Sequence, residues 1–221
     1  MAIPVLIIGK SGSGKSTSMR NCVDDPHWNL IKVLEKPLPF RGKIRQCTTD
    51  DYTKVMASLA SSTASSIVID DAGYLLTNTF MYGHSNAGSG NAIFSFYNVL
   101  ADNFWNLIMF IMNLPADKIV YLMMHEEKND FGDVKAKTIG KMLDEKVCVE
   151  GMFTIVLRAV KEGDNYYFVT QSDNRAVSKS PLGMFSELKI DNDLAAVDKR
   201  IREYWEMNGG ENNGNDENPG Q

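Results

Sequence analysis

The chain has 221 residues, 43% of them hydrophobic, and a formal net charge of −5. This length can bury a sizeable core and indicates one domain, while the net acidity excludes a protein that is basic over its whole surface. Three scattered cysteines argue against a disulfide framework and a C-x-x-C metal site. No apolar run approaches the roughly 20 residues of a membrane helix, and the first residues are strand-like rather than a signal peptide. We therefore expect a cytoplasmic protein without membrane contact.

The first part of the chain alternates apolar strands with helices. The runs typical of buried strands are Ile3–Gly9, Leu30–Glu35, Ser66–Ile69 and Lys118–Met124. Helical spacing of apolar residues occurs over Asp50–Leu59 and Ala92–Met112. This order predicts an α/β fold with a mostly parallel sheet, flanked by helices and joined by right-handed crossovers.

The late part of the chain predicts antiparallel structure. Met152–Val160 and Tyr166–Gln171 alternate in polarity around a short polar turn, as the two strands of a β-hairpin do. A closing helix is expected over Asp193–Glu206, with Asp191 or Asn192 as its N-cap. The hairpin should lie at one edge of the sheet.

Three segments are expected to be irregular. Thr77–Asn91 is rich in Gly, Asn and Ser and predicts a mobile loop, and the charged Glu126–Lys146 predicts a second loop with a short helix. Asn208–Gln221 holds three acids, no base and no large apolar side chain, so we expect a disordered acidic tail after a domain over 1–207.

One motif specifies chemistry directly. Residues Gly9–Ser16 (GKSGSGKS) match the whole phosphate-binding pattern G-x-x-x-x-G-K-[ST], and they follow an apolar strand and precede a short helix. Glycines let successive backbone N–H groups curl around phosphate oxygens, and the helix adds the positive end of its dipole. The residues expected to bind the nucleotide are Gly9, Lys10, Ser11, Gly12, Ser13, Gly14, Lys15, Ser16 and Thr17.

Within this loop the polar side chains have distinct roles. Lys15 neutralises charge on the β- and γ-phosphates, the Ser16 hydroxyl is a Mg²⁺ ligand, and Thr17 lies beside the α-phosphate.

A second motif, the partner of the loop, is the apolar strand that ends in Asp70 and Asp71. Asp70 directly follows the apolar run and is expected to hold Mg²⁺ opposite Ser16.

The sequence leaves two candidates for the residue that orients the attacking water. Asp71 lies just beyond the expected metal ligand, and Glu35 closes the second predicted strand, where ligands of α/β proteins gather. His125 follows the fourth predicted strand, which suits either a polar sensor of the bound nucleotide or a solvated histidine.

Beyond these motifs, the chain resembles a known family. GKSGSGKST at Gly9–Thr17, KPLPF at Lys36–Phe40, IVIDDAGYL at Ile67–Leu75 and SKSPLGMF at Ser178–Phe185 resemble the P-loop nucleotide-binding proteins of bacteriophages that infect Gram-positive bacteria. More broadly, the chain is similar to RecA-like phage ATPases, which include single-strand annealing proteins. The resemblance covers most of Ala2–Phe185.

This resemblance implies a RecA-like fold and ATP and Mg²⁺ as cofactors. It places Glu35 where RecA-like enzymes keep a catalytic glutamate, although EKPLPF departs from the recombinase pattern. In a homo-oligomer or filament, Lys179, or as second choice Arg175, would reach the γ-phosphate of a neighbouring subunit. The two predicted loops lie where RecA-like proteins contact single-stranded DNA, and the first offers Phe80 among its stacking side chains.

The sequence therefore predicts an ATPase that acts in phage DNA recombination or replication. Two alternatives remain. A nucleoside or nucleotide kinase shares the loop, but such enzymes generally clamp phosphates with an arginine-rich lid, and there is no arginine between Arg45 and Arg158. A nucleotide-dependent interaction module with little turnover is the other alternative.

Overall fold

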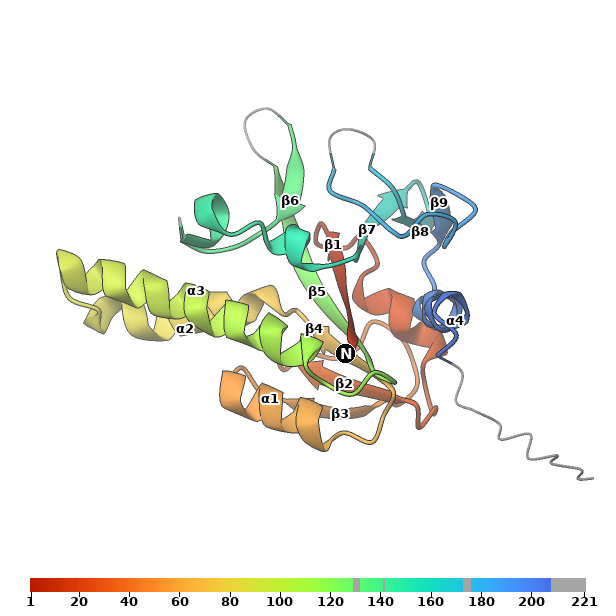
Figure 1. Ribbon diagram of the computed structural model, residues 1–221, viewed down its shortest axis with the longest axis horizontal. Coiled ribbons are helices and arrows are strands. Elements are labelled where there is room, and N and C mark those ends of the chain that lie inside the picture. Colours follow the sequence, from red (N-terminus) through yellow and green to blue (C-terminus); the bar gives the residue numbers. More distant parts are fainter. Residues whose placement is uncertain (129–131, 141, 173–175, 208–221) are drawn as a thin grey trace, which may run out of the picture.

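The computed structural model describes residues 1–128, 132–140, 142–172 and 176–207. Within these residues one sheet has the strand order β3-β2-β4-β5-β1-β7-β8-β9, with β6 paired to the end of β5 (Figure 1). The strands are β1 (Ile3–Gly9), β2 (Trp28–Lys32), β3 (Arg45–Thr48), β4 (Ser66–Asp70), β5 (Ile119–Lys128), β6 (Val134–Ala136), β7 (Ile155–Glu162), β8 (Asn165–Val169) and β9 (Lys189–Asp191).

The sheet is parallel from β3 to β7 and antiparallel at its late edge. Parallel pairing joins β2 to β3 and β4, β4 to β5, and β1 to both β5 and β7. β7, β8 and β9 pair in antiparallel fashion. The predicted α/β class, the parallel sheet and the edge hairpin are thereby confirmed.

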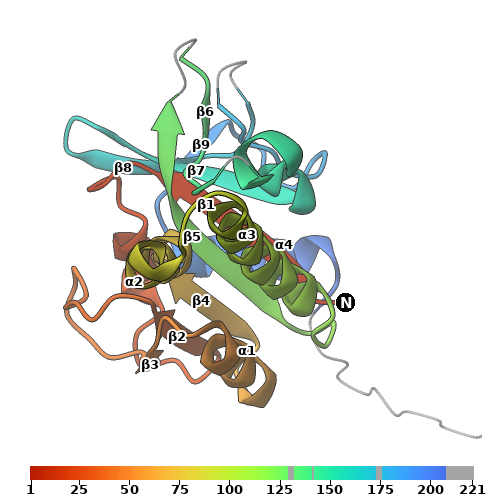
Figure 2. The ribbon, with the colours of Figure 1, turned by 90° about the vertical axis from the view of Figure 1, so that its left-hand side faces the viewer.

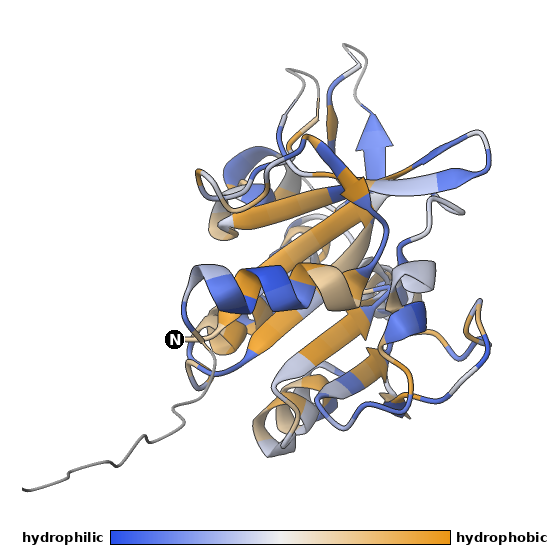
Figure 3. Cartoon of the chain, turned by 90° about the vertical axis from the view of Figure 1, so that its right-hand side faces the viewer, coloured by the Kyte–Doolittle hydropathy of each residue, from blue (hydrophilic) through white to orange (hydrophobic). Residues whose placement is uncertain are grey.

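Helices cover both faces of this sheet. The α-helices are α1 (Tyr52–Ser61), α2 (Gly73–Gly83), α3 (Asn91–Met112) and α4 (Leu194–Tyr204). Short turns of other helix types are η1 (Ser16–Asn21), η2 (His84–Asn86), η3 (Met142–Lys146) and η4 (Val149–Met152). Figure 2 shows α1, α2 and α3 in front of the sheet, and Figure 3 shows α4 on the other side, in front of strongly hydrophobic strands.

The continuous apolar runs of the central strands follow from this two-sided cover. In β1, Leu6 and Ile8 lie in the core cluster under α1–α3, whereas Val5 and Ile7 lie in the cluster under α4. Side chains of a strand alternate between faces, so a strand covered on both sides must be apolar at every position.

The expectation of a mobile loop over Thr77–Asn91 is wrong, because most of that segment is helical. α2 runs to Gly83, and η2 follows directly. The hydroxyl groups of Thr77 and Thr79 donate to carbonyl oxygens four residues earlier, and Phe80 stacks on Tyr97 of α3 with ring centroids 5.9 Å apart. Packing of aromatic side chains between α2 and α3 outweighs the loop-like composition.

Other boundaries also differ from the prediction. β3 and β9 are edge strands of four and three residues that have no clear apolar pattern. The second predicted strand ends earlier, at Lys32, and the fourth continues to Lys128, so that it forms an arm with β6 where a loop was expected. The N-cap of α4 is Asp193, whose carboxylate accepts hydrogen bonds from the backbone N–H of Ala195 and Ala196.

Two further expectations concern the tail of the chain and the membrane. The predicted acidic tail over 208–221 lies outside the described residues. Across the part of the chain that is described, no helix is both long and apolar enough to span a bilayer.

Candidate functional site

The predicted phosphate loop lies at the carboxyl edge of the parallel strands. It joins β1 to η1. The strand next to β1 is β5, in which His125 is paired with Gly9, and the strand after it is β4, which ends at Asp70. A cavity of about 260 Å³ opens at this place. Its lining residues are Ser11, Gly12, Gly14, Lys15, Ser16, Thr17, Lys36, Pro37, Pro39, Asp71 and His125.

Glycines are required at two positions of the loop. A Cβ atom on Gly9 would meet Ser13 Oγ and would lie 2.7 Å from the carbonyl oxygen of Ala159 on β7. Gly14 has a φ of +94°, and a Cβ there would lie 2.7 Å from a ring carbon of Tyr166. A side chain at position 9 would therefore push β1 away from β7, and one at position 14 would be strained by the backbone and would displace Tyr166.

Lys15 points into the loop. Its Nζ donates hydrogen bonds to the carbonyl oxygens of Gly9 (2.8 Å) and Lys10 (2.9 Å). Burial lowers the pKa of Lys15, and the charges of Asp71 and Asp70 oppose that shift. The ammonium group is thus held at the point where the loop would enclose phosphate oxygens.

Ser16 and Asp70 meet across the site. Ser16 Oγ lies 2.9 Å from each carboxylate oxygen of Asp70, although the two residues are 54 positions apart. Burial, and then the charge of Asp71, raise the pKa of Asp70. A hydroxyl and a carboxylate oxygen are the hard ligands that Mg²⁺ prefers, so the donor set fits this ion.

The metal would need further ligands from elsewhere. Among the described residues no group of three or more His, Cys, Asp or Glu side chains could hold a metal ion. Mg²⁺ at nucleotide sites usually keeps several waters and binds substrate phosphates, which agrees with a site of two protein ligands.

Asp71 and Glu35, the two candidates for orienting water, have different surroundings. Asp71 has a φ of +59°, and its buried carboxylate lies in the cavity. Glu35 is 75% exposed and pairs with Lys32 at 2.9 Å. Hydrogen bonds from Thr48 and Lys32 lower the pKa of Glu35. The geometry places Asp71, and not Glu35, at the cavity.

His125 is a second polar group beside Asp71. It is paired in register with Gly9, its Nε2 lies 3.9 Å from Asp71 Oδ1, and its ring contacts Tyr74 edge to face. Burial and the charge of Lys15 lower the pKa of His125, so the imidazole is neutral at neutral pH. His125 therefore lies at the cavity, and its role as a sensor of the bound nucleotide remains a prediction.

Lys36 was missed as a site residue by reasoning from motifs. Its Nζ forms an ion pair with Asp71 Oδ2, and the two following prolines, Pro37 and Pro39, also line the cavity. The available signals were the KPLPF motif at Lys36–Phe40 and its position after the predicted strand Leu30–Glu35, which runs parallel to the strand that ends in Asp70.

Lys179 does not line the cavity. Its backbone exchanges two hydrogen bonds with Val156, near the start of β7. Its predicted role concerns a neighbouring subunit and remains a prediction, and the alternative, Arg175, lies outside the described residues.

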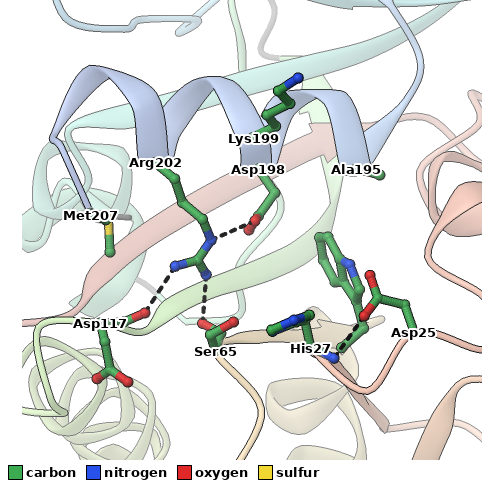
Figure 4. A pocket seen from close by; sticks show the side chains of 10 residues that line it. Asp25, His27, Ser65, Asp117, Ala195, Asp198, Lys199, Arg202 and Met207 are labelled. Atoms are coloured by element: carbon green, nitrogen blue, oxygen red, sulfur yellow. Dashed lines mark hydrogen bonds and ion pairs between the residues drawn. The ribbon is translucent and has the colours of Figure 1, made fainter. Parts of the chain in front are cut away.

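A second cavity, of about 480 Å³, lies at the opposite, amino end of the strands (Figure 4). Asp198 of α4 accepts hydrogen bonds there from Ser66 Oγ (2.6 Å), Tyr121 Oη (2.8 Å) and Arg202 Nε (2.8 Å). Arg202 also donates to the carbonyl oxygens of Ser65 and Asp117. This network fastens α4 to the sheet and explains the buried charges without a ligand.

We expect Asp198→Ala to destabilise the fold by about 2 kcal/mol, because three donors around the carboxylate would lose their acceptor. Thermal or urea unfolding followed by circular dichroism measures this loss. Lys199→Ala, at the next and exposed position of α4, is the matched control and should change stability by less than about 0.5 kcal/mol. Equal stability of the two variants would contradict the structural role of Asp198.

Comparison with known proteins identifies the family of the chain. The sequence model of the AAA domain family matches residues 1–182. Solved structures similar to the chain include the pilus retraction motor PilT with bound ADP, at 11% identity and a TM-score of 0.39, over 93% of this chain and 53% of that one. Another is the ATPase DotB of Legionella pneumophila, at 11% identity and a TM-score of 0.34, over 78% of this chain and 47% of that one. The chain thus spans about half the length of these two structures. No curated protein matches it.

Proposed function

The chain belongs to the AAA domain family, and from this premise we propose that it is a P-loop ATPase that hydrolyses ATP with Mg²⁺ held at Ser16 and Asp70. The observation that carries the proposal is the contact between Ser16 Oγ and both oxygens of Asp70. It brings together the hydroxyl that ends the phosphate loop and the acid that ends β4.

The proposed mechanism consists of positioning and charge neutralisation. The loop's N–H groups and Lys15 would hold the β- and γ-phosphates, with Lys15 exchanging two carbonyl partners for phosphate oxygens. Asp71 would accept a hydrogen bond from the attacking water and align it with the γ-phosphate. Bound Mg²⁺ would supply neutralisation of the phosphate charge as the terminal phosphoryl group is transferred to water.

Phosphate release tests this function. We expect release from ATP in the presence of Mg²⁺ and its loss with excess EDTA, because the carboxylate of Asp70 cannot contact phosphate oxygens without a bridging cation. Transfer of phosphate to a nucleoside instead of water would identify a kinase, and tight ATP binding without release would identify an interaction module.

Asp70→Asn is expected to raise the Mg²⁺ concentration that supports half-maximal turnover by about 10-fold or more, since the ion loses its anionic protein ligand. A Mg²⁺ titration at saturating ATP measures this change. Asp102→Asn on the exposed side of α3 removes one charge from a residue that does not line the cavity and is the matched control. An unchanged Mg²⁺ requirement in Asp70→Asn would refute the metal site.

For the partner of this ATPase we propose single-stranded DNA, in phage recombination or replication. The resemblance of the motifs supports this proposal. The arm formed by β5 and β6 also supports it, because it carries Lys128 and Lys135 and is directly followed by Lys137. The arm also carries Glu126 and Glu127, and Lys135 pairs with Glu127 at 3.3 Å. Any electrostatic attraction of DNA would therefore be local.

A DNA-stimulation assay tests the partner separately from the ATPase itself. Turnover should rise on addition of single-stranded DNA, and the stimulation should fall as salt increases. Sedimentation with an ATP analogue and DNA would report at the same time whether the chain assembles into the homo-oligomer or filament that a role for Lys179 requires. Turnover that is indifferent to DNA at low salt would exclude this partner.

A further inference from the structure

The cavity beside the phosphate loop contains a second cation. Lys36 reaches it from the segment after β2, a part of the chain separate from the loop that carries Lys15. We propose that Lys36 binds the γ-phosphate from within the same chain, leaves Asp71 in doing so, and thereby makes the site distinguish ATP from ADP. This inference rests on the proposed ATPase function and adds a residue and a nucleotide preference to it.

The ion pair between Lys36 and Asp71 is the first support. Asp71 is 4% exposed, whereas the Lys36 side chain is 47% exposed, so the lysine comes to a fixed carboxylate from the open side of the cavity. Asp71 also has a left-handed backbone, a conformation that is uncommon for a residue with a Cβ and that clusters at functional sites.

The anchoring of the segment around Lys36 is the second support. Lys32 Nζ donates to the carbonyl oxygen of Lys36 at 3.2 Å. Pro37 and Pro39, which come after Lys36, each have a φ fixed by the proline ring. Phe40 packs against the core under α4. The backbone is therefore held at the cavity, while the long side chain of Lys36 keeps rotational freedom.

The charge of Lys36 suits a phosphate ligand. Burial acts to lower the pKa of Lys36, but the hydrogen bond and the charge of Asp71 together raise it above its usual value. The ammonium group thus stays protonated at neutral pH and offers three donors to an anion. A γ-phosphate carries more charge than one carboxylate and is present in ATP but absent from ADP.

The exchange of partners would also prepare Asp71. While Asp71 is paired with Lys36, the cation occupies the carboxylate oxygen Oδ2. Movement of the ammonium group to the γ-phosphate frees that oxygen to accept a hydrogen bond from water. Arrival of the γ-phosphate and release of the water-orienting carboxylate would then be one event.

Nucleotide titrations test this proposal. Fluorescent ADP and a fluorescent, non-hydrolysable ATP analogue are titrated into the wild type, Lys36→Ala and Lys36→Gln, each with Mg²⁺. We expect both variants to lose about 10-fold or more in affinity for the ATP analogue, the size of one charge-assisted contact, and less than about 2-fold for ADP. Lys36→Arg should keep most of the preference because it keeps the charge.

Lys54→Ala, which removes an exposed lysine from α1, is the matched control. Lys36→Gln keeps a hydrogen-bond donor for Asp71, and its melting curve and ADP affinity show that the site is intact. The proposal is overturned if a variant with intact ADP binding keeps wild-type affinity for the ATP analogue, or if both nucleotides weaken equally in a variant that melts like the wild type. Failure of the wild type to bind either nucleotide would instead refute the proposed function.

Discussion

Replacing Lys15 with alanine is expected to lower ATP affinity by at least about 100-fold, since the variant loses charge-assisted contacts to two phosphate groups, each of which contributes about 1.5–3 kcal/mol. Lys15 is already aimed at the centre of the loop through the carbonyl oxygens of Gly9 and Lys10. The ammonium group of Lys15 is also buried before ATP arrives, and this burial lowers its pKa. Contact with phosphate would therefore give the charge favourable electrostatic interactions in place of those with water.

Equilibrium titration of a fluorescent ATP derivative measures this loss. Lys54→Ala provides the control for the removal of one positive charge from the whole chain. A melting curve of Lys15→Ala is needed beside it, because two loop carbonyl oxygens lose their donor. Wild-type affinity in a folded Lys15→Ala variant would mean that the loop does not enclose the phosphates, and every role assigned to Ser16, Asp70 and Asp71 would fall with it.

The parts of this site that the sequence predicts are those encoded by short, contiguous patterns. β1 agrees with its predicted bounds, and β4 extends the predicted strand by one residue, to Asp70. The predicted phosphate loop is recognised from residue types at fixed spacing, because Gly9 and Gly14 lie too close to neighbouring segments to carry a side chain. The contact between Ser16 and Asp70 could be expected once the strand before the loop and the strand that ends in Asp70 were assigned to one parallel sheet.

The parts that it does not predict depend on contacts between distant segments. Thr77, Asn78 and Thr79 favour a loop by composition, whereas this stretch is helical and Phe80 packs against α3. Lys36 belongs to no phosphate-binding pattern and becomes a site residue because the exit of β2 faces the turn that holds Asp71. Neither contact can be read from local periodicity.

For the same reason, the sequence does not decide whether Glu35 or Asp71 orients the attacking water. A pair of variants decides between them. We expect Asp71→Asn to lower kcat by about 100- to 10,000-fold, the usual contribution of a group that takes up or orients a proton in the transition state. Asparagine tolerates the left-handed backbone conformation at this position, so the fold should persist. ATP affinity should change far less than kcat, because the phosphates are held by the loop.

Glu35→Gln is the matched substitution, since it also exchanges one carboxylate for an amide. Glu35 is largely exposed and pairs with Lys32, so its loss should leave kcat within about 2-fold of the wild type. Steady-state phosphate release at saturating ATP and Mg²⁺ gives kcat for both variants, and ATP titration shows that each still binds. The reverse result, a collapse of kcat in Glu35→Gln with Asp71→Asn active, would assign the water to Glu35. It would also require the segment after β2 to turn inward when ATP binds, which would move Lys36 as well and separate it from Asp71.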